Sequence, residues 1–285
     1  LGGVDDAGLQ AEVLGHRQRT EAGGVTGAEV GVDICEREPG IGKCPGGHLG
    51  DSHRRPYRRE GAGPGRLILG GDDPILVDTG AASPEIMGRL GMTAYQTPEQ
   101  TLDAQLAAHG VKLDDVRWIL HTHHHIDHAG QDDRFPKATV ITNRRELEYS
   151  ASGIMGAQYP PEYVKHHIDR LHAKDALRLL DLELSGPDEV LPGIVCEVAG
   201  GHTEGSMNIN VETSAGVVCI CGDVIYDVQD QVVAPMYQVG DYDPQVTGNH
   251  SMRKREEKAA VVKALNSGTF VVPSHDWPAR VVRGE

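Results

Sequence analysis

Six residues that can bind a metal ion lie close together between Ile119 and Gly130, a stretch that reads I-L-H-T-H-H-H-I-D-H-A-G. They are His121, His123, His124, His125, Asp127 and His128. Neutral imidazole is the most common metal-binding side chain, and a carboxylate is a good companion ligand for zinc. The chemistry that this spacing favours is therefore metal binding.

The residues before this stretch explain how the side chains can converge. The run from Val116 to Leu120 is short and apolar and predicts a buried strand. Where the chain turns after a strand, side chains two positions apart can reach one point, so His123 and His125 suit one metal ion. Asp127 and His128 are offset toward a second one. Gly130 then allows the backbone to turn away without steric cost.

Three further apolar runs end in a polar residue: Ile75 to Val77 before Asp78-Thr79-Gly80, Val217 to Cys221 before Gly222-Asp223, and Phe270 to Ser274 before His275. A fourth element is a lone histidine in the loop Gly201-His202-Thr203-Glu204-Gly205. A histidine-rich surface turn with incidental metal affinity would leave these four elements unexplained. Their order, together with H-x-H-x-D-H at residues 123–128, resembles the signature of the metallo-β-lactamase superfamily.

The resemblance implies a fold and a metal centre. The fold is α/β (α+β), a four-layer αββα sandwich over residues 66–285. The expected ligands are His123, His125 and His202 for one divalent ion, Asp127, His128 and His275 for the other, and Asp223 as the bridge. Zinc is the expected metal, and manganese, iron or cobalt would also fit nitrogen and oxygen ligands. Two such ions can hold a hydroxide that attacks an electrophilic carbonyl.

One residue points to a substrate class. Tyr226 lies three residues after Asp223, a spacing that is similar to quorum-quenching N-acyl homoserine lactonases, where a tyrosine contacts the lactone carbonyl. The resemblance implies a lactonase in which Tyr226 polarises that carbonyl and Asp127 passes a proton to the leaving alkoxide. A tyrosine packed in the core is the alternative. Glu204 and Ser206 depart from the G-H-T-P-G-H segment of those lactonases.

Other activities of the same fold stay open, because fold and metals do not determine the substrate. A glyoxalase II-like thioester hydrolase would usually add a C-terminal helical domain, and few residues follow His275. An exported β-lactamase would need a leader. Aryl-ester and phosphotriester hydrolases fit as well, and a non-catalytic metal-binding protein would bind metal without turnover.

The charge and hydropathy of the chain limit the classes of molecule that it is expected to bind. The formal net charge is −15, which disfavours nucleic acid. No apolar run is long enough for a transmembrane helix, so no membrane partner is expected. The expected partner is a small lactone or ester, a homodimer stays open, and the expected location is cytoplasmic. The five cysteines show no zinc-finger spacing and are expected to be small buried hydrophobic residues.

Two segments do not follow this regular pattern. Residues 1–65 are rich in Gly, Arg and Pro and predict an irregular segment, either partly disordered or carrying edge strands. Residues 152–180 predict a mostly helical insertion, which would be either a lid over the metal turn or an amphipathic helix with exposed histidines. Its His166, His167 and His172 are not expected to bind metal. Asp78 is expected to support a metal-binding imidazole.

Further elements are expected from capping and apolar patterns. They are a hairpin of Leu67 to Leu69 with Ile75 to Val77, a helix from Pro98 to Gly110, a strand from Ala138 to Thr142, a helix from Asn143 to Tyr149, strands from Ile194 to Val198 and from Met207 to Val211, a helix from Arg253 to Leu265, and a strand from Thr269 to Val272.

Overall fold

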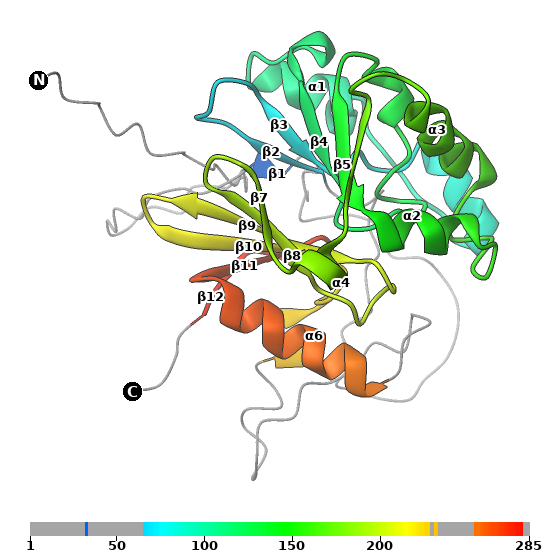
Figure 1. Ribbon diagram of the computed structural model, residues 1–285. Coiled ribbons are helices and arrows are strands. Elements are labelled where there is room, and N and C mark those ends of the chain that lie inside the picture. The colour runs from blue at the N-terminus through cyan, green and yellow to red at the C-terminus, as the bar shows by residue number, and fades with distance from the viewer. Residues whose placement is uncertain (1–31, 34–64, 229–230, 233–253, 282–285) are drawn as a thin grey trace, which may run out of the picture.

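The computed structural model describes residues 32–33, 65–228, 231–232 and 254–281, and it has four layers (Figure 1). Two β-sheets pack face to face, and helices cover their outer faces. The helices are η1 (Pro84–Leu90), η2 (Pro98–Gln100), α1 (Leu102–Ala108), η3 (Leu113–Asp115), η4 (Asp132–Arg134), α2 (Arg144–Ala151), α3 (Pro161–Leu171), α4 (Leu182–Ser185) and α6 (Lys254–Ser267), where η denotes a 3-10 helix. This is the α/β sandwich that the sequence predicts.

The first sheet takes its strands in chain order. They are β1 (Val32–Asp33), β2 (Arg66–Ile68), β3 (Ile75–Val77), β4 (Trp118–Leu120), β5 (Thr139–Asn143) and β6 (Leu177–Leu180). The predicted hairpin is present, since β2 and β3 pair antiparallel. From β3 to β6 the neighbours are parallel, so their carboxyl ends lie at one edge of the sheet.

The second sheet is mostly antiparallel. Its strands are β7 (Asp188–Leu191), β8 (Ile194–Val198), β9 (Met207–Thr213), β10 (Gly216–Gly222), β11 (Phe270–Pro273) and β12 (Ala279–Arg280). Strands β7 to β10 form a meander, and β11 returns through α6 to pair parallel with β10. Because β10 and β11 are parallel, the residues that follow them emerge at the same edge.

The alternation of side chains along the central strands explains the sandwich. Leu120 and Ile141 point into the core between the two sheets, where Ile209 and Ile220 of the second sheet meet them. Their neighbours point the other way, and Ile119 packs with α1 on the outer face. Both faces of these strands are therefore buried, and each such aliphatic side chain stabilises the fold by about 1.5–3 kcal/mol.

The outer layer of the second sheet is α6. Its Val261 and Ala264 pack against Cys219 and Cys221, which face the same side of β10. These two thiols and Cys196 are buried and free, as expected for small apolar side chains. Among the described residues, no helix combines the length and apolar character needed to cross a membrane.

Two predicted elements differ from the structure. The predicted helix from Pro98 to Gly110 is divided into η2 and α1, because Thr101 adopts an extended conformation and its hydroxyl caps the second helix at the Ala104 N–H. The 152–180 range is not helical to its end. Residues 177–180 form β6, which completes the first sheet beside β5.

Most of the predicted N-terminal segment, residues 1–65, lies outside the described residues. Of its described part, β1 pairs antiparallel with β2 at the edge of the first sheet. The predicted disorder or edge strands elsewhere in that segment concern residues that the structure does not describe.

Candidate metal centre

The seven predicted metal-binding residues meet at the edge where the two sheets present their strand ends. His123, His125, Asp127 and His128 lie in the turn after β4, and His202 lies in the loop between β8 and β9. Asp223 follows β10 directly, and His275 follows β11 by two positions. The seven side chains form two adjacent groups, each able to hold a metal ion.

The first group consists of three imidazoles whose ring nitrogens face one another. His123 Nε2 lies 3.1 Å from His125 Nδ1, and His202 Nε2 lies 3.1 Å and 3.0 Å from these two atoms. All three residues are buried. We call this group the all-imidazole cluster.

The electrostatics of this cluster fit a cation. Burial lowers the pKa of His125 to about 4, and burial together with the neighbouring imidazoles lowers the pKa of His123 well below its usual value. Both rings are therefore neutral near pH 7. In a neutral imidazole each ring nitrogen is either an N–H donor or a bare acceptor, so at least one of the three N···N contacts must place two donors or two acceptors together. A metal ion accepts all three lone pairs at once.

The second group, the carboxylate-containing cluster, comprises Asp127, His128, Asp223 and His275. His128 Nε2 lies 3.2 Å from Asp223 Oδ1, and His275 Nε2 lies 3.2 Å from Asp223 Oδ2. Asp127 completes the group, with its Oδ2 3.5 Å from His275 Nε2.

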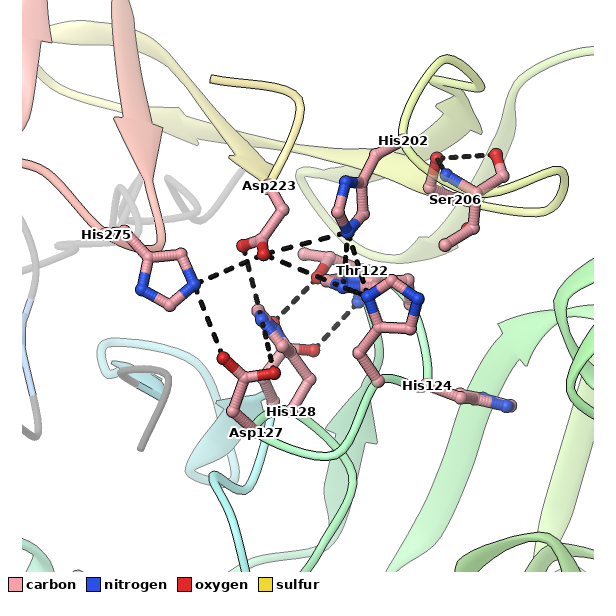
Figure 2. A network of polar contacts seen from close by, with 12 residues as sticks. Thr122, His124, Asp127, His128, His202, Ser206, Asp223 and His275 are labelled. Atoms are coloured by element: carbon pink, nitrogen blue, oxygen red, sulfur yellow. Dashed lines mark hydrogen bonds and ion pairs between the residues drawn. The ribbon is translucent and has the colours of Figure 1, made fainter. Parts of the chain in front are cut away.

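Asp223 lies between the two clusters. Its Oδ2 is 3.7 Å from His202 Nε2 and 3.9 Å from His123 Nε2, in addition to its contacts with His128 and His275. Figure 2 shows its carboxylate between the rings of His275 and His202. A carboxylate in this position can contact ions in both clusters.

Charges in the second cluster are strongly coupled. Burial opposes ionisation of Asp223, but the His275 and His128 imidazoles hold its pKa well below the usual range. Burial lowers the pKa of His128, but Asp223, Asp127 and Asp78 raise it far above its usual value. Without metal, this cluster therefore keeps a proton on His128 that a metal ion would have to displace.

Asp78 supports the turn from beneath. Its Oδ2 accepts hydrogen bonds from His128 Nδ1 at 2.9 Å and from the Thr122 hydroxyl at 2.7 Å, and its Oδ1 accepts from the Thr122 N–H at 2.9 Å. This agrees with the predicted supporting role, in which a carboxylate orients a metal-binding imidazole. Asp78 reaches these partners from a left-handed backbone conformation, with φ of 59°.

Glu146 of α2 supports the turn from the other side. Its buried carboxyl accepts hydrogen bonds from the His124 N–H at 2.9 Å, the Tyr159 hydroxyl at 3.0 Å and the Thr203 hydroxyl at 2.6 Å. One side chain therefore connects the turn after β4 with the loop that carries His202. Burial raises the pKa of Glu146, although these donors act against the rise.

The loop after β10 places Tyr226 beside the site. Its ring stacks on His275, with centroids 5.1 Å apart and planes within 4° of parallel. The Gln231 Oε1 accepts the Tyr226 N–H at 2.6 Å, and Asp276 accepts the Val228 N–H at 2.7 Å. These two bonds attach the loop on both sides of the stack, so the position of Tyr226 is defined.

A family comparison matches residues 66–275, which include every residue of both clusters, to the model of the metallo-β-lactamase superfamily. The chain belongs to this superfamily.

Several relatives in the superfamily are N-acyl homoserine lactonases. The chain is 29% identical to that of Bacillus cereus over 166 residues, which cover 54% of this chain and 60% of the relative. It is 25% identical to that of Bacillus thuringiensis over 198 residues, 65% of this chain and 72% of the relative. A probable metallo-hydrolase of Mycobacterium bovis is 28% identical over 179 residues, 56% of each chain.

Solved structures share the superfamily fold. An N-acyl homoserine lactone hydrolase with N-hexanoyl-L-homoserine at its catalytic metal centre matches with a TM-score of 0.54 and 21% identity, over 70% of this chain and 74% of the other. AidC, a dizinc quorum-quenching lactonase, matches with a TM-score of 0.54 and 18% identity, over 75% and 72%. At these identities, the matches establish the fold alone.

The remaining histidines of the turn do not face the two clusters. His121 is buried beneath them. His124 points away from its neighbours (Figure 2), and its Nε2 lies 2.9 Å from the Thr142 hydroxyl. Its ring stacks on His167, with centroids 4.2 Å apart.

The sequence analysis missed Asp132, Glu146 and the burial of His167. His167 is buried in α3 and lies 2.9 Å from Asp132, so the expectation of exposed histidines on this helix is wrong at this position. The available signal was the spacing of Tyr163, His167 and Arg170, which places three polar side chains on one helical face.

Proposed function

We propose that this chain is a metal-dependent hydrolase that opens the ring of a lactone of the N-acyl homoserine lactone type. The observation that carries the proposal is Tyr226, which stacks on His275 three residues after Asp223. The names of the Bacillus relatives support the substrate class. The seven cluster residues are proposed as ligands of two ions, with zinc as the first choice.

The bound ions would supply a water of lowered pKa and polarise the substrate carbonyl. Tyr226 would donate a hydrogen bond from its hydroxyl to the carbonyl oxygen, where negative charge develops when the carbonyl carbon is attacked and before the ring opens. A phenol is suited to this task because it donates without carrying a charge.

Asp127 would protonate the leaving group. It is partly buried, with 14% of its side chain exposed, and it approaches both His128 and His275. A carboxyl at the edge of the cluster can hold a proton and pass it to the alkoxide oxygen that leaves the carbonyl carbon. Asp127 therefore both contributes to the cluster and completes the reaction.

The test uses the purified chain loaded separately with zinc, manganese, iron and cobalt. Initial rates are measured on an N-acyl homoserine lactone, a thioester, an aryl ester and a phosphotriester. The proposal expects the highest kcat/KM on the lactone. Faster thioester cleavage would contradict it, and metal binding without any turnover would support a non-catalytic role.

Tyr226→Phe removes the hydroxyl and keeps the stack on His275. Loss of one donor to a developing oxyanion costs up to about 10²–10³-fold in kcat, and loss of the Tyr226 hydroxyl is expected to cost about tenfold or more. The matched control is Tyr95→Phe, because Tyr95 is 81% exposed. If Tyr226→Phe and the control cleave the lactone at equal rates, the Tyr226 hydroxyl does not contribute to catalysis and this part of the proposal is wrong.

A further inference from the structure

A third group of buried polar side chains lies beneath the metal turn. It consists of His121, Asp132 and His167, each almost completely buried. His121 Nε2 lies 2.8 Å from Asp132 Oδ2, and His167 Nε2 lies 2.9 Å from the same oxygen. The other oxygen, Asp132 Oδ1, accepts the Thr79 hydroxyl at 2.8 Å. We call this group the Asp132 network.

The contacts in the Asp132 network differ in kind from those of the all-imidazole cluster. There, imidazole nitrogens face one another at 3.0–3.1 Å, an arrangement that a cation would satisfy. Here, each imidazole nitrogen faces a carboxylate oxygen at the length of an N–H···O hydrogen bond. The contacts are satisfied by hydrogen atoms already present on the rings, without a metal ion.

A fixed charge beside the network also disfavours a third dication. The Arg170 guanidinium donates to the carbonyl oxygen of Asp132 at 2.8 Å, to that of Phe135 at 2.9 Å and to that of Ala138 at 2.7 Å. Arginine stays protonated at any ordinary pH. A metal ion at Asp132 would have to share the site with this cation.

The network attaches α3 to the metal turn. Tyr163, His167 and Arg170 occupy one face of the helix, and all three are buried. Tyr163 donates its hydroxyl to the Ile126 carbonyl, inside the metal turn, and accepts the Ala82 N–H. The helix therefore docks through these polar groups, and His167 is not one of the exposed histidines predicted for an amphipathic helix.

From the network, contacts continue to a proposed metal ligand. His121 Nδ1 lies 3.3 Å from Asp78 Oδ1, and the other oxygen of Asp78 accepts the His128 Nδ1–H at 2.9 Å. The path runs from α3 through Asp132, His121 and Asp78 to His128. Each step is a buried contact between side chains, and therefore the position of one group restricts the next.

We propose that His167 and Asp132 are positioning residues, which hold His128 in the geometry for metal binding through His121 and Asp78. The proposal rests on the proposed function only in that His128 binds a metal. It assigns α3 the task of setting the affinity of the carboxylate-containing cluster without touching substrate.

The test measures metal affinity, which does not require the lactone to be the right substrate. The affinities of the two clusters for zinc are determined by competition with a chelator in wild type, His167→Leu and His167→Gln. Loss of a partner behind a metal ligand lowers metal affinity by about 10–100-fold. His167 lies three residues further along the path than Asp78, so we expect a loss at the lower end of this range, about tenfold, at the carboxylate-containing cluster. The loss at the all-imidazole cluster should be smaller, because Asp78 reaches His123 only through the Thr122 hydroxyl.

Recovery of zinc affinity in a conservative variant distinguishes a positioning role of His167 from a role in packing. Glutamine keeps an N–H donor, so His167→Gln is expected to recover most of the affinity. The controls are His172→Leu and His172→Gln, because His172 is exposed at the end of the same helix. Both are expected to bind zinc as wild type does.

Asp132→Asn provides a second variant if His167→Leu does not fold. An amide has one acceptor oxygen where the carboxylate has two, so one of the three donors to Asp132 is displaced. A selective loss at the carboxylate-containing cluster is again expected. Cobalt-loaded protein should show an altered visible spectrum at this cluster.

Three outcomes would overturn the proposal. The first is wild-type affinity at both clusters in His167→Leu and Asp132→Asn. The second is an equal loss at both clusters, which indicates general destabilisation. The third is three metal ions per wild-type chain, one of which disappears in either variant, because the Asp132 network would then be a metal site. Failure on lactones alone affects the proposed function and leaves this proposal standing.

Discussion

The all-imidazole cluster and the Asp132 network both bring together buried histidines from distant parts of the chain, but the contacts of their imidazoles differ. In the cluster, nitrogen faces nitrogen, and the rings of His123 and His125 are held neutral. In the network, nitrogen faces oxygen, and Asp132 and Asp78 raise the pKa of His121 to about 9 despite its burial. An imidazole that faces other imidazoles is thus kept neutral and can bind a cation, whereas an imidazole that faces two carboxylates, as His121 does, is kept protonated and is itself a cation.

The largest effect is expected from Asp223→Ala, which removes the carboxylate between the two clusters. Replacing a residue that only orients a metal ligand lowers metal affinity or activity by about 10–100-fold. Replacing a residue that contacts both clusters should therefore lower kcat/KM by more than about 100-fold. The metal content should fall below two ions per chain, measured by elemental analysis. Asp72→Ala, at an exposed position, is the control. Retention of two ions and full rate would show that Asp223 is not shared.

A pH series of zinc affinities sharpens the comparison between the two clusters. His128 has a raised pKa in the metal-free protein and must lose a proton to bind, whereas His125 titrates at about 4 and is already neutral near pH 7. As the pH falls below neutral, affinity at the carboxylate-containing cluster should fall about tenfold per unit, since one proton is displaced. The all-imidazole cluster should hold its ion until the pH approaches about 4, where His125 takes up a proton. A parallel loss at both clusters would contradict this order.

The smallest effect is expected in the Asp132 network from Thr79→Val. The variant removes the hydroxyl that donates to Asp132 Oδ1 at 2.8 Å and accepts the Gln131 N–H at 3.1 Å. Groups left without a partner cost about 1–3 kcal/mol in the free energy of unfolding. The loss should be similar with and without zinc, as measured by urea denaturation. Thr139→Val, whose hydroxyl contacts the Asp175 carbonyl at the surface, should lose less. A destabilisation that appears only with zinc would place Thr79 in the metal centre.

The sequence was sufficient to predict the strands that lead into the metal centre. Ile75 to Val77 and Ile194 to Val198 are strands with the predicted bounds, because an apolar run of that length has few alternatives in a sandwich. His202, Asp223 and His275 were placed near the turn after β4 by the resemblance to the superfamily, and each comes after a predicted strand. Parallel neighbours such as β10 and β11 deliver such residues to one edge.

The Asp132 network could not be predicted in the same way. Asp132 lies in a 3-10 turn and His167 in a helix, and no strand precedes either residue. Their contact depends on how α3 docks, which is determined by Tyr163 and Arg170 as much as by His167. Residues 177–180 were included in the predicted helical insertion, although they form a strand. In so short a run, Leu177 and Leu180 fit the repeat of a helix as well as that of a strand.

Asp78 shows how narrowly one position can be constrained. A left-handed backbone is tolerated by glycine and, less well, by asparagine and aspartate, and it costs other residues about 1–3 kcal/mol. Two oxygens that both accept from cationic or polar neighbours require an acid. Glycine would relax the chain and remove the acceptor; glutamate would keep the acceptor and strain the chain. Of the twenty amino acids, aspartate alone meets both demands, so a library randomised at this codon should return it almost without exception.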